Sequence, residues 1–179
     1  DNGYFDSCLL CNCVDFVYCK VHKRYNQQVN NEKGSKLMIS DATNVNMRGV
    51  KYAFIMLKPD AIKRGLVTDI MGYFLSKGFS IELFDVKQVV DEQIYEHYYD
   101  KIVEEGDLFR TKAYRYFHGE IVIPVIISHE RKDIIQYVRS IVGYKDPALA
   151  DQQSIRGRWG VDSMEKSESE ERCCENLIH

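Results

Sequence analysis

A run of apolar residues at positions 52–57 stops abruptly at Lys58 and Pro59, and a helical pattern follows it. The run is typical of a buried central strand, whereas the apolar residues after it recur at spacings of three and four and predict a helix that ends at Gly78. Pro59 cannot donate to a strand ladder and suits the first turn of a helix. Lys58 is therefore expected at a strand-to-helix turn, where a cation can meet an anionic ligand. A lysine that ends a surface strand fits the same pattern.

Strand and helix patterns continue to alternate beyond this turn. Apolar alternation and β-rich runs predict strands, and spacings of three and four predict helices, at residues 79–90 (strand), 91–99 (helix), 108–117 (helix), 121–127 (strand) and 132–142 (helix). We expect Asp91 as an N-cap, a loop that contains Gly106 and a helix end at Gly143. Residues 144–174 are expected to be irregular, with solvated surface from 163 to 172, before a short last strand at 176–179. This order predicts an α/β (α+β) fold, a ferredoxin-like sandwich with an antiparallel four-stranded sheet.

Residues 1–48 differ from the rest of the chain and are expected to form an irregular N-terminal extension and linker, followed by one domain at 49–179. The extension is rich in Asn, Cys and Lys and shows no sustained hydrophobic period. Two closely spaced pairs of potential ligands occur in it, Cys8 with Cys11 and Cys19 with His22. Such pairs could hold zinc in a tetrahedral site, and a cysteine-rich tail without metal is the alternative.

Composition and charge narrow the function classes. The chain has 179 residues and a net charge of −3, which gives no indication of a nucleic-acid or membrane partner. No run is long and apolar enough to span a bilayer, and no basic region precedes the apolar residues near the N-terminus, so we expect neither a membrane span nor a signal peptide. Six cysteines in a chain that otherwise has the pattern of an intracellular enzyme favour a reducing, cytoplasmic location.

Several short motifs occur in a fixed order across residues 52–179. They are Lys58-Pro59-Asp60-Ala61 with Arg64-Gly65-Leu66-Val67, His97-Tyr98-Tyr99, Arg139 four residues before Gly143, Asp146-Pro147-Ala148, Ser154-Ile155-Arg156-Gly157 and Asn176-Leu177-Ile178-His179. In this order they resemble the motifs of the nucleoside diphosphate kinase family. The resemblance makes a ligand-binding role for Lys58 the favoured interpretation.

The resemblance implies an activity and a set of site residues. It implies ping-pong transfer of the γ-phosphate of ATP or another nucleoside triphosphate to a nucleoside diphosphate, through a phosphohistidine at His179. A neutral imidazole is a good nucleophile near neutral pH, and phosphoryl transfer otherwise needs positioning and charge neutralisation. The resemblance assigns nucleotide or phosphate binding to Lys58, Tyr98, Leu108, Phe109, Arg139, Lys145, Arg156 and Asn176. It also implies Mg²⁺ held mainly by the nucleotide and water, and a homo-oligomer, either a tetramer or a hexamer.

Three departures from the family pattern change these expectations. The family stacks the base on an aromatic side chain, and here either Leu108 or Phe109 takes that place, giving apolar contact in the first case and stacking in the second. Lys145 stands where the family usually has a phosphate-binding threonine. The sequence also stops at His179, before the family's last segment, so the domain is expected to be truncated and its transfer impaired. The alternative function is a catalytically impaired nucleotide-binding module with a regulatory or interaction role.

Overall fold

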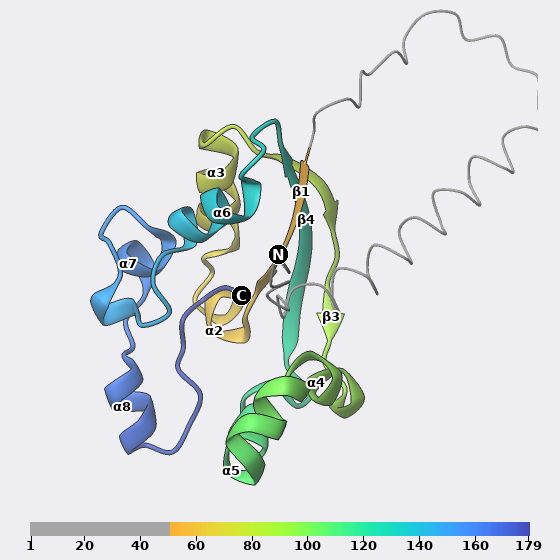
Figure 1. Ribbon diagram of the computed structural model, residues 1–179, viewed down its shortest axis with the longest axis vertical. Coiled ribbons are helices and arrows are strands. Elements are labelled where there is room, and N and C mark those ends of the chain that lie inside the picture. Colours follow the sequence, from red (N-terminus) through yellow and green to blue (C-terminus); the bar gives the residue numbers. More distant parts are fainter. Residues whose placement is uncertain (1–50) are drawn as a thin grey trace, which may run out of the picture. The chain divides into compact units, whose positions relative to one another are not determined.

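The computed structural model describes residues 51–179, which contain a four-stranded antiparallel sheet with helices around it (Figure 1). The strands are β1 (Lys51–Leu57), β2 (Ser80–Phe84), β3 (Lys87–Gln88) and β4 (Ile121–His129). Strand β4 is central, because β1, β2 and β3 all pair with it in antiparallel register. The predicted fold class is confirmed. The zinc candidates Cys8, Cys11, Cys19 and His22 lie outside the described residues.

The helices cover the sheet unevenly. Their bounds are α2 (Pro59–Lys63), α3 (Val67–Ser76), α4 (Asp91–His97), α5 (Tyr99–Phe117), α6 (Ile134–Val142), the 3₁₀ helix η1 (Pro147–Leu149), α7 (Ile155–Trp159) and α8 (Met164–Ser169). Helices α3 and α6 lie along one side of the sheet, whereas α4 and α5 lie together at one end of it (Figure 1). This leaves the end of β1, the turn into α2 and the last residues of the chain close to both helix groups.

Two hydrophobic clusters correspond to these helix groups. The side chains of Ile123, Val125 and Ile127 point from one face of β4 into the larger cluster, which includes Phe74 of α3 and Val138 of α6. Side chains alternate along a strand, so Val122 points the other way, into the smaller cluster with Ile94, Ala113 and Phe117. Each face of β4 therefore has its own apolar partner.

The first strand and helix agree with the pattern that predicted them. Strand β1 spans the expected apolar run, Pro59 is the first residue of α2, and α3 ends just before Gly78. Gly143 ends α6 with a φ of 89°, as predicted for a glycine at a helix end. The loop expected around Gly106 is reduced to one non-helical residue with a φ of 77°, because the residues on both sides of it belong to α5.

Other sequence predictions were wrong in detail. Asp91 is the first residue of α4 rather than its N-cap, which is Val90. The segment expected to be irregular contains η1, α7 and α8, because polar residues cap these short helices: Asp146, Ser154 and Ser163 each accept a backbone hydrogen bond. The stretch from 163 to 172 is not all solvated, since Ser167 is 1% exposed. Residues 176–179 form one isolated bridge instead of a strand, between Leu57 and Ile178.

Candidate functional site

The last residues of the chain lie along the free edge of β1. The backbone N–H of His179 donates to Met56 O at 2.9 Å, and Met56 N–H donates to His179 O at 2.9 Å. One residue pair further on, Lys58 N–H donates to Leu177 O at 2.8 Å. These bonds hold His179 beside the end of β1, where the strand passes into α2 and delivers Lys58.

Lys58 is the buried cation of this site. Lys58 is only 6% exposed, and its Nζ donates to Asn176 Oδ1 at 2.8 Å and to Cys174 O at 3.0 Å. The ammonium group also lies 4.7 Å from the ring centroid of Tyr116. Burial lowers the pKa of Lys58, and the nearby charge of Asp60 acts in the opposite direction.

Arg156, at the second position of α7, holds three backbone carbonyls at once. Its Nε donates to Asn176 O at 3.1 Å, its Nη1 to Gly143 O at 3.0 Å and its Nη2 to Ile178 O at 2.6 Å. Burial lowers the pKa of Arg156 to about 10, which leaves the guanidinium charged at neutral pH. The planar fork therefore fixes the residues on both sides of Leu177 and brings a second cation to the segment that ends in His179.

Asn176 connects these groups through both ends of its side-chain amide. Its Oδ1 accepts from Lys58, and its Nδ2 donates to Lys145 O at 2.9 Å. The backbone carbonyl of Lys145 is therefore part of the site, although Lys145 as a whole is exposed. Arg139 is also exposed, in the last turn of α6, and its carbonyl accepts from Gly143 N–H at 2.9 Å. Both residues lie close to the loop that Arg156 holds.

The ring of His179 lies against aromatic side chains from the junction of α4 and α5. Its centroid is 4.6 Å from the ring centroid of His97 and 6.2 Å from that of Tyr98. His179 as a whole residue is exposed, but these rings exclude water from one side of the imidazole. Desolvation, followed by His97, Lys58, Arg156 and Lys101, lowers the pKa of His179 to about 3. The imidazole is therefore neutral at physiological pH and keeps a lone pair for nucleophilic attack.

The structure distinguishes the two residues proposed for base contact. Phe109 packs inward, with its ring centroid 5.5 Å from that of Tyr98. Leu108 points out of the smaller cluster and is 59% exposed. Only Leu108 has a large free surface to offer a base, and it would provide apolar contact without stacking.

Sequence reasoning gave no role to some residues of this site. The sequence indicates His97 only as part of a motif, yet it contacts the ring of His179, and desolvation followed by the charge of Lys58 lowers its own pKa to about 4. The carbonyl of Cys174 accepts from Lys58, and a backbone group of this kind leaves no signal in a sequence. The adjacency of His97 to Tyr98 was the one signal that could have indicated the first contact.

The donor groups of the site are suited to a metal that arrives with a nucleotide. Within residues 51–179, no cluster of three His, Cys, Asp or Glu side chains has the geometry to hold a metal ion. The site instead presents Lys58 and Arg156, which complement phosphate oxygens. Mg²⁺ usually keeps several waters and binds through substrate phosphates, so this arrangement fits Mg²⁺ bound mainly by the nucleotide.

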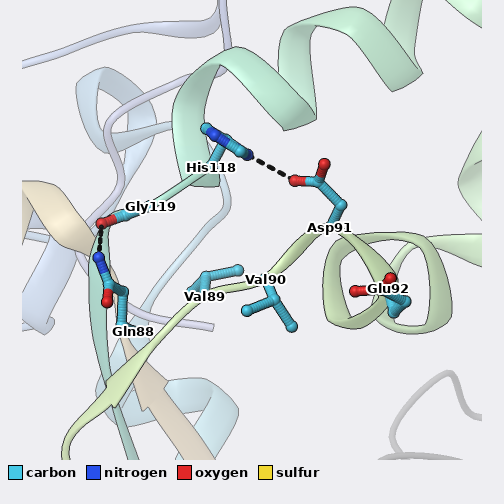
Figure 2. A pocket seen from close by; sticks show the side chains of 7 residues that line it. All are labelled: Gln88, Val89, Val90, Asp91, Glu92, His118 and Gly119. Carbon is cyan, nitrogen blue, oxygen red and sulfur yellow. Dashed lines mark hydrogen bonds and ion pairs between the residues drawn. The ribbon is translucent and has the colours of Figure 1, made fainter.

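A separate shallow pocket lies near the start of α4. Figure 2 shows its lining residues, which are Gln88, Val89, Val90, Asp91, Glu92, His118 and Gly119. Within it, His118 Nδ1 lies 2.5 Å from Asp91 Oδ1, and Gln88 Nε2 donates to Gly119 O at 3.1 Å. None of the lining residues is among the predicted site residues, so this pocket is not part of the site around His179.

Comparisons with known proteins find similar sequences over the same residues. The family model described as "Nucleoside diphosphate kinase" matches residues 51–179. A nucleoside diphosphate kinase of Methanothermobacter thermautotrophicus is 36% identical over 114 residues, which cover 64% of this chain and 73% of that protein. One from Desulfitobacterium hafniense is 35% identical over 116 residues, covering 63% of this chain and 72% of the relative.

Solved structures show the same fold. A nucleoside-diphosphate kinase of Borrelia burgdorferi with bound vanadate and ADP, described as a transition state mimic, superposes with a TM-score of 0.67 at 24% identity, covering 73% of this chain and 78% of that one. A halophilic nucleoside diphosphate kinase of Halobacterium salinarum in complex with CDP gives a TM-score of 0.59 at 26% identity, covering 72% and 75%. None of the helices within residues 51–179 is long and apolar enough to cross a membrane.

Proposed function

The chain belongs to the nucleoside diphosphate kinase family, and we propose that it transfers a γ-phosphate by a ping-pong mechanism in which His179 becomes phosphorylated. The observation that carries this proposal is the convergence of two cations on the segment that ends in a neutral histidine. Lys58 and Arg156 each donate hydrogen bonds within residues 174–178, next to His179. Cations beside a neutral nucleophile are what phosphoryl transfer to an imidazole requires.

In the first half-reaction, an imidazole nitrogen of His179 attacks the γ-phosphorus of a nucleoside triphosphate. A nitrogen–phosphorus bond forms, the bond from the γ-phosphorus to the bridging oxygen breaks, and the nucleoside diphosphate leaves with the bond electrons. The second half-reaction is the reverse, with a different diphosphate as acceptor. Lys58 and Arg156 stabilise the charge on the phosphate oxygens, and Arg139, Lys145 and Asn176 complete the set of proposed phosphate contacts. Mg²⁺, when bound with the nucleotide, would neutralise further phosphate charge.

We propose that Tyr98 and Leu108 contact the nucleotide beyond its phosphates, while Phe109 supports Tyr98 from behind. Leu108 is 59% exposed, whereas Phe109 lies 5.5 Å from Tyr98 between ring centroids. Apolar contact does not read the edge of a base, so broad nucleotide specificity follows. The similar structure from Halobacterium salinarum, which is in complex with CDP, supports acceptance of a base other than adenine.

The catalytic domain in this proposal is residues 49–179, which form one compact unit. We propose that copies of the domain assemble into a tetramer or hexamer in the cytoplasm. Apolar side chains around β2 support self-association, since Ile81, Phe84 and Val86 are 36%, 46% and 56% exposed. Sedimentation equilibrium would test this part, and a monomer at micromolar concentration would contradict it.

Phosphorylation of His179 can be tested directly with ATP labelled at the γ-phosphate. The wild type should acquire label that is labile in acid and stable in base, and adding unlabelled nucleoside diphosphate should remove it. His179→Ala should take up no label while still binding nucleotide. His118→Ala is the matched control, because His118 is exposed and lies outside the proposed site. Equal labelling of the His179→Ala variant and the wild type would contradict the assignment.

A further inference from the structure

A buried carboxylate connects three elements of the site. Asp60, in the first turn of α2, is 4% exposed. Its Oδ1 accepts from Tyr116 Oη of α5 at 2.6 Å, and its Oδ2 accepts from the backbone N–H of Leu177 at 2.9 Å. Both carboxylate oxygens are thus occupied by groups from distant parts of the chain, so Asp60 cannot shift without moving α5 or the segment before His179.

Tyr116 extends this connection to Lys58. Its hydroxyl donates to Asp60, while its ring lies 4.7 Å from Lys58 Nζ, which places the ammonium over the aromatic face. Burial, together with the charge and hydrogen bond of Asp60, raises the pKa of Tyr116. The phenol therefore stays protonated and remains a donor, and the ring holds a fixed position under Lys58.

Leu177 shows why the bond from its N–H matters. Its φ is 70°, a left-handed conformation that is unfavourable for a branched residue, and Ile178 N–H donates to Asn176 O at 2.8 Å across it in a tight turn. Strained backbone of this kind persists only where surrounding contacts determine it. The charge-assisted bond to Asp60 fixes the centre of the turn, with Asn176 on one side and His179 on the other.

We propose that Asp60 and Tyr116 act together as positioning residues that set the Leu177 turn and the Lys58 ammonium for phosphorylation of His179. The inference rests on the proposed phosphohistidine mechanism and adds two residues that touch neither nucleotide nor phosphate. A misplacement of about 1 Å near reacting atoms can reduce a rate about 100-fold. Loss of either residue should therefore slow phosphorylation more than it weakens nucleotide binding.

The test compares Tyr116→Phe with Tyr114→Phe, a matched change on the same helix. Tyr114 is also partly buried and donates its hydroxyl to a backbone carbonyl, Asp91 O at 3.1 Å, but it does not contact Lys58, Asp60 or the last residues of the chain. Three quantities are measured for each variant: the single-turnover rate of labelling from γ-labelled ATP, the Kd for ADP and the melting temperature. Tyr116→Phe should label at least about tenfold more slowly with Kd changed less than about threefold, and Tyr114→Phe should label at the wild-type rate.

A second variant, combined with the first, tests whether Asp60 and Tyr116 act together. Asp60→Asn keeps the volume and one acceptor but loses the charge, and it should slow labelling in the same way. Because the two residues act as one unit, the double variant should be no slower than the slower single variant. Multiplied effects in the double variant, or equal labelling rates in Tyr116→Phe and Tyr114→Phe, would overturn the inference. If the wild type takes up label on His179 and the Tyr116→Phe and Asp60→Asn variants label at the same rate, only the positioning role is refuted. If the wild type takes up no label, the phosphohistidine mechanism is refuted as well.

Discussion

Replacing Arg156 should cost both folding stability and phosphoryl transfer, because one side chain serves both. In Arg156→Ala, three charge-assisted hydrogen bonds to the carbonyls of Gly143, Asn176 and Ile178 are lost. At about 1.5–3 kcal/mol for each bond to a charged group, they contribute roughly 5–9 kcal/mol. Burial of the guanidinium offsets part of this, since a fall in the pKa of Arg156 from 12.5 to about 10 corresponds to roughly 3 kcal/mol. The free energy of unfolding should therefore decrease by roughly 2–6 kcal/mol.

The same helix supplies a control and a reporter. Arg158 is exposed, lies over the ring of Tyr73 at 4.9 Å and donates to Gln153 Oε1 at 2.7 Å. Arg158→Ala should change stability by less than about 1 kcal/mol, as expected for exposed contacts. The single tryptophan of the chain, Trp159, packs edge-on against Tyr73 at 5.8 Å, so its fluorescence should follow urea unfolding of this region.

Activity measurements complete the comparison. Arg156→Ala should also lower kcat/KM. The decrease should correspond to a loss of about 2–4 kcal/mol in transition-state stabilisation, the scale for loss of one preorganised charge-stabilising donor. Arg156→Lys keeps the charge but not the fork, so it should be intermediate in both measurements. If Arg156→Ala and Arg158→Ala unfold within about 1 kcal/mol of each other, the three carbonyl contacts are not important in solution and the reasoning is wrong.

Three other outcomes are expected. Gly143→Ala should lower the free energy of unfolding in urea by at least about 2 kcal/mol, because a Cβ would collide with Ser154 and the φ of 89° is unfavourable for alanine. Gly72→Ala, which has open space around its Cβ, should raise that free energy by about 0.5–1 kcal/mol, and an unchanged stability of Gly143→Ala would contradict the geometry. The free energy of unfolding should fall below pH 6.5, because His97 and His179 stay neutral in the fold down to about pH 4 and pH 3 while the unfolded chain takes up the protons. The share of His97 is about 2 kcal/mol at pH 5, so a His97→Gln variant should show a fall that is smaller by that amount, and an equal fall in the variant and the wild type would contradict this. Leu108→Phe should lower the KM for nucleotides a few-fold by adding a stacking surface, without changing the melting temperature, and an unchanged KM would place the base elsewhere.

The fold was predictable because its signals are local. The apolar run ending at Lys58, the proline at the first turn of α2 and the glycine that ends α6 each follow from the properties of a few neighbouring residues. The helices α7 and α8 escaped prediction because each is only five or six residues long. Such helices depend on a capping side chain and tertiary contacts more than on an apolar period.

The site was predictable only in part, for a different reason. The motifs indicated which residues belong to it, but not which atoms meet. Lys58 bonds to Asn176 across 118 sequence positions, and Asp60 bonds to Leu177 across 117. No hydrophobic period in the sequence encodes a contact between residues so far apart. The donor in the second contact is also a backbone N–H, a group that does not distinguish Leu177 from its neighbours. The orientation of Phe109 inward and Leu108 outward likewise depends on where α5 packs.

Buried cations and strained backbone, which both cost stability, occur together around Leu177. Their concentration there supports a function for this segment. Lys58 and Arg156 are cations whose pKa values burial lowers, and among the non-glycine residues from 51 to 179 only Glu171 and Leu177 have a positive φ. Each feature costs stability, of order 1–3 kcal/mol for the strained backbone alone. A sequence shaped only for stability would use apolar side chains and relaxed backbone here, as it does in the clusters on both faces of β4. A reaction on anionic phosphates needs these cations and a fixed turn before the histidine, so the unfavourable burial of the cations and the backbone strain occur where transfer requires them.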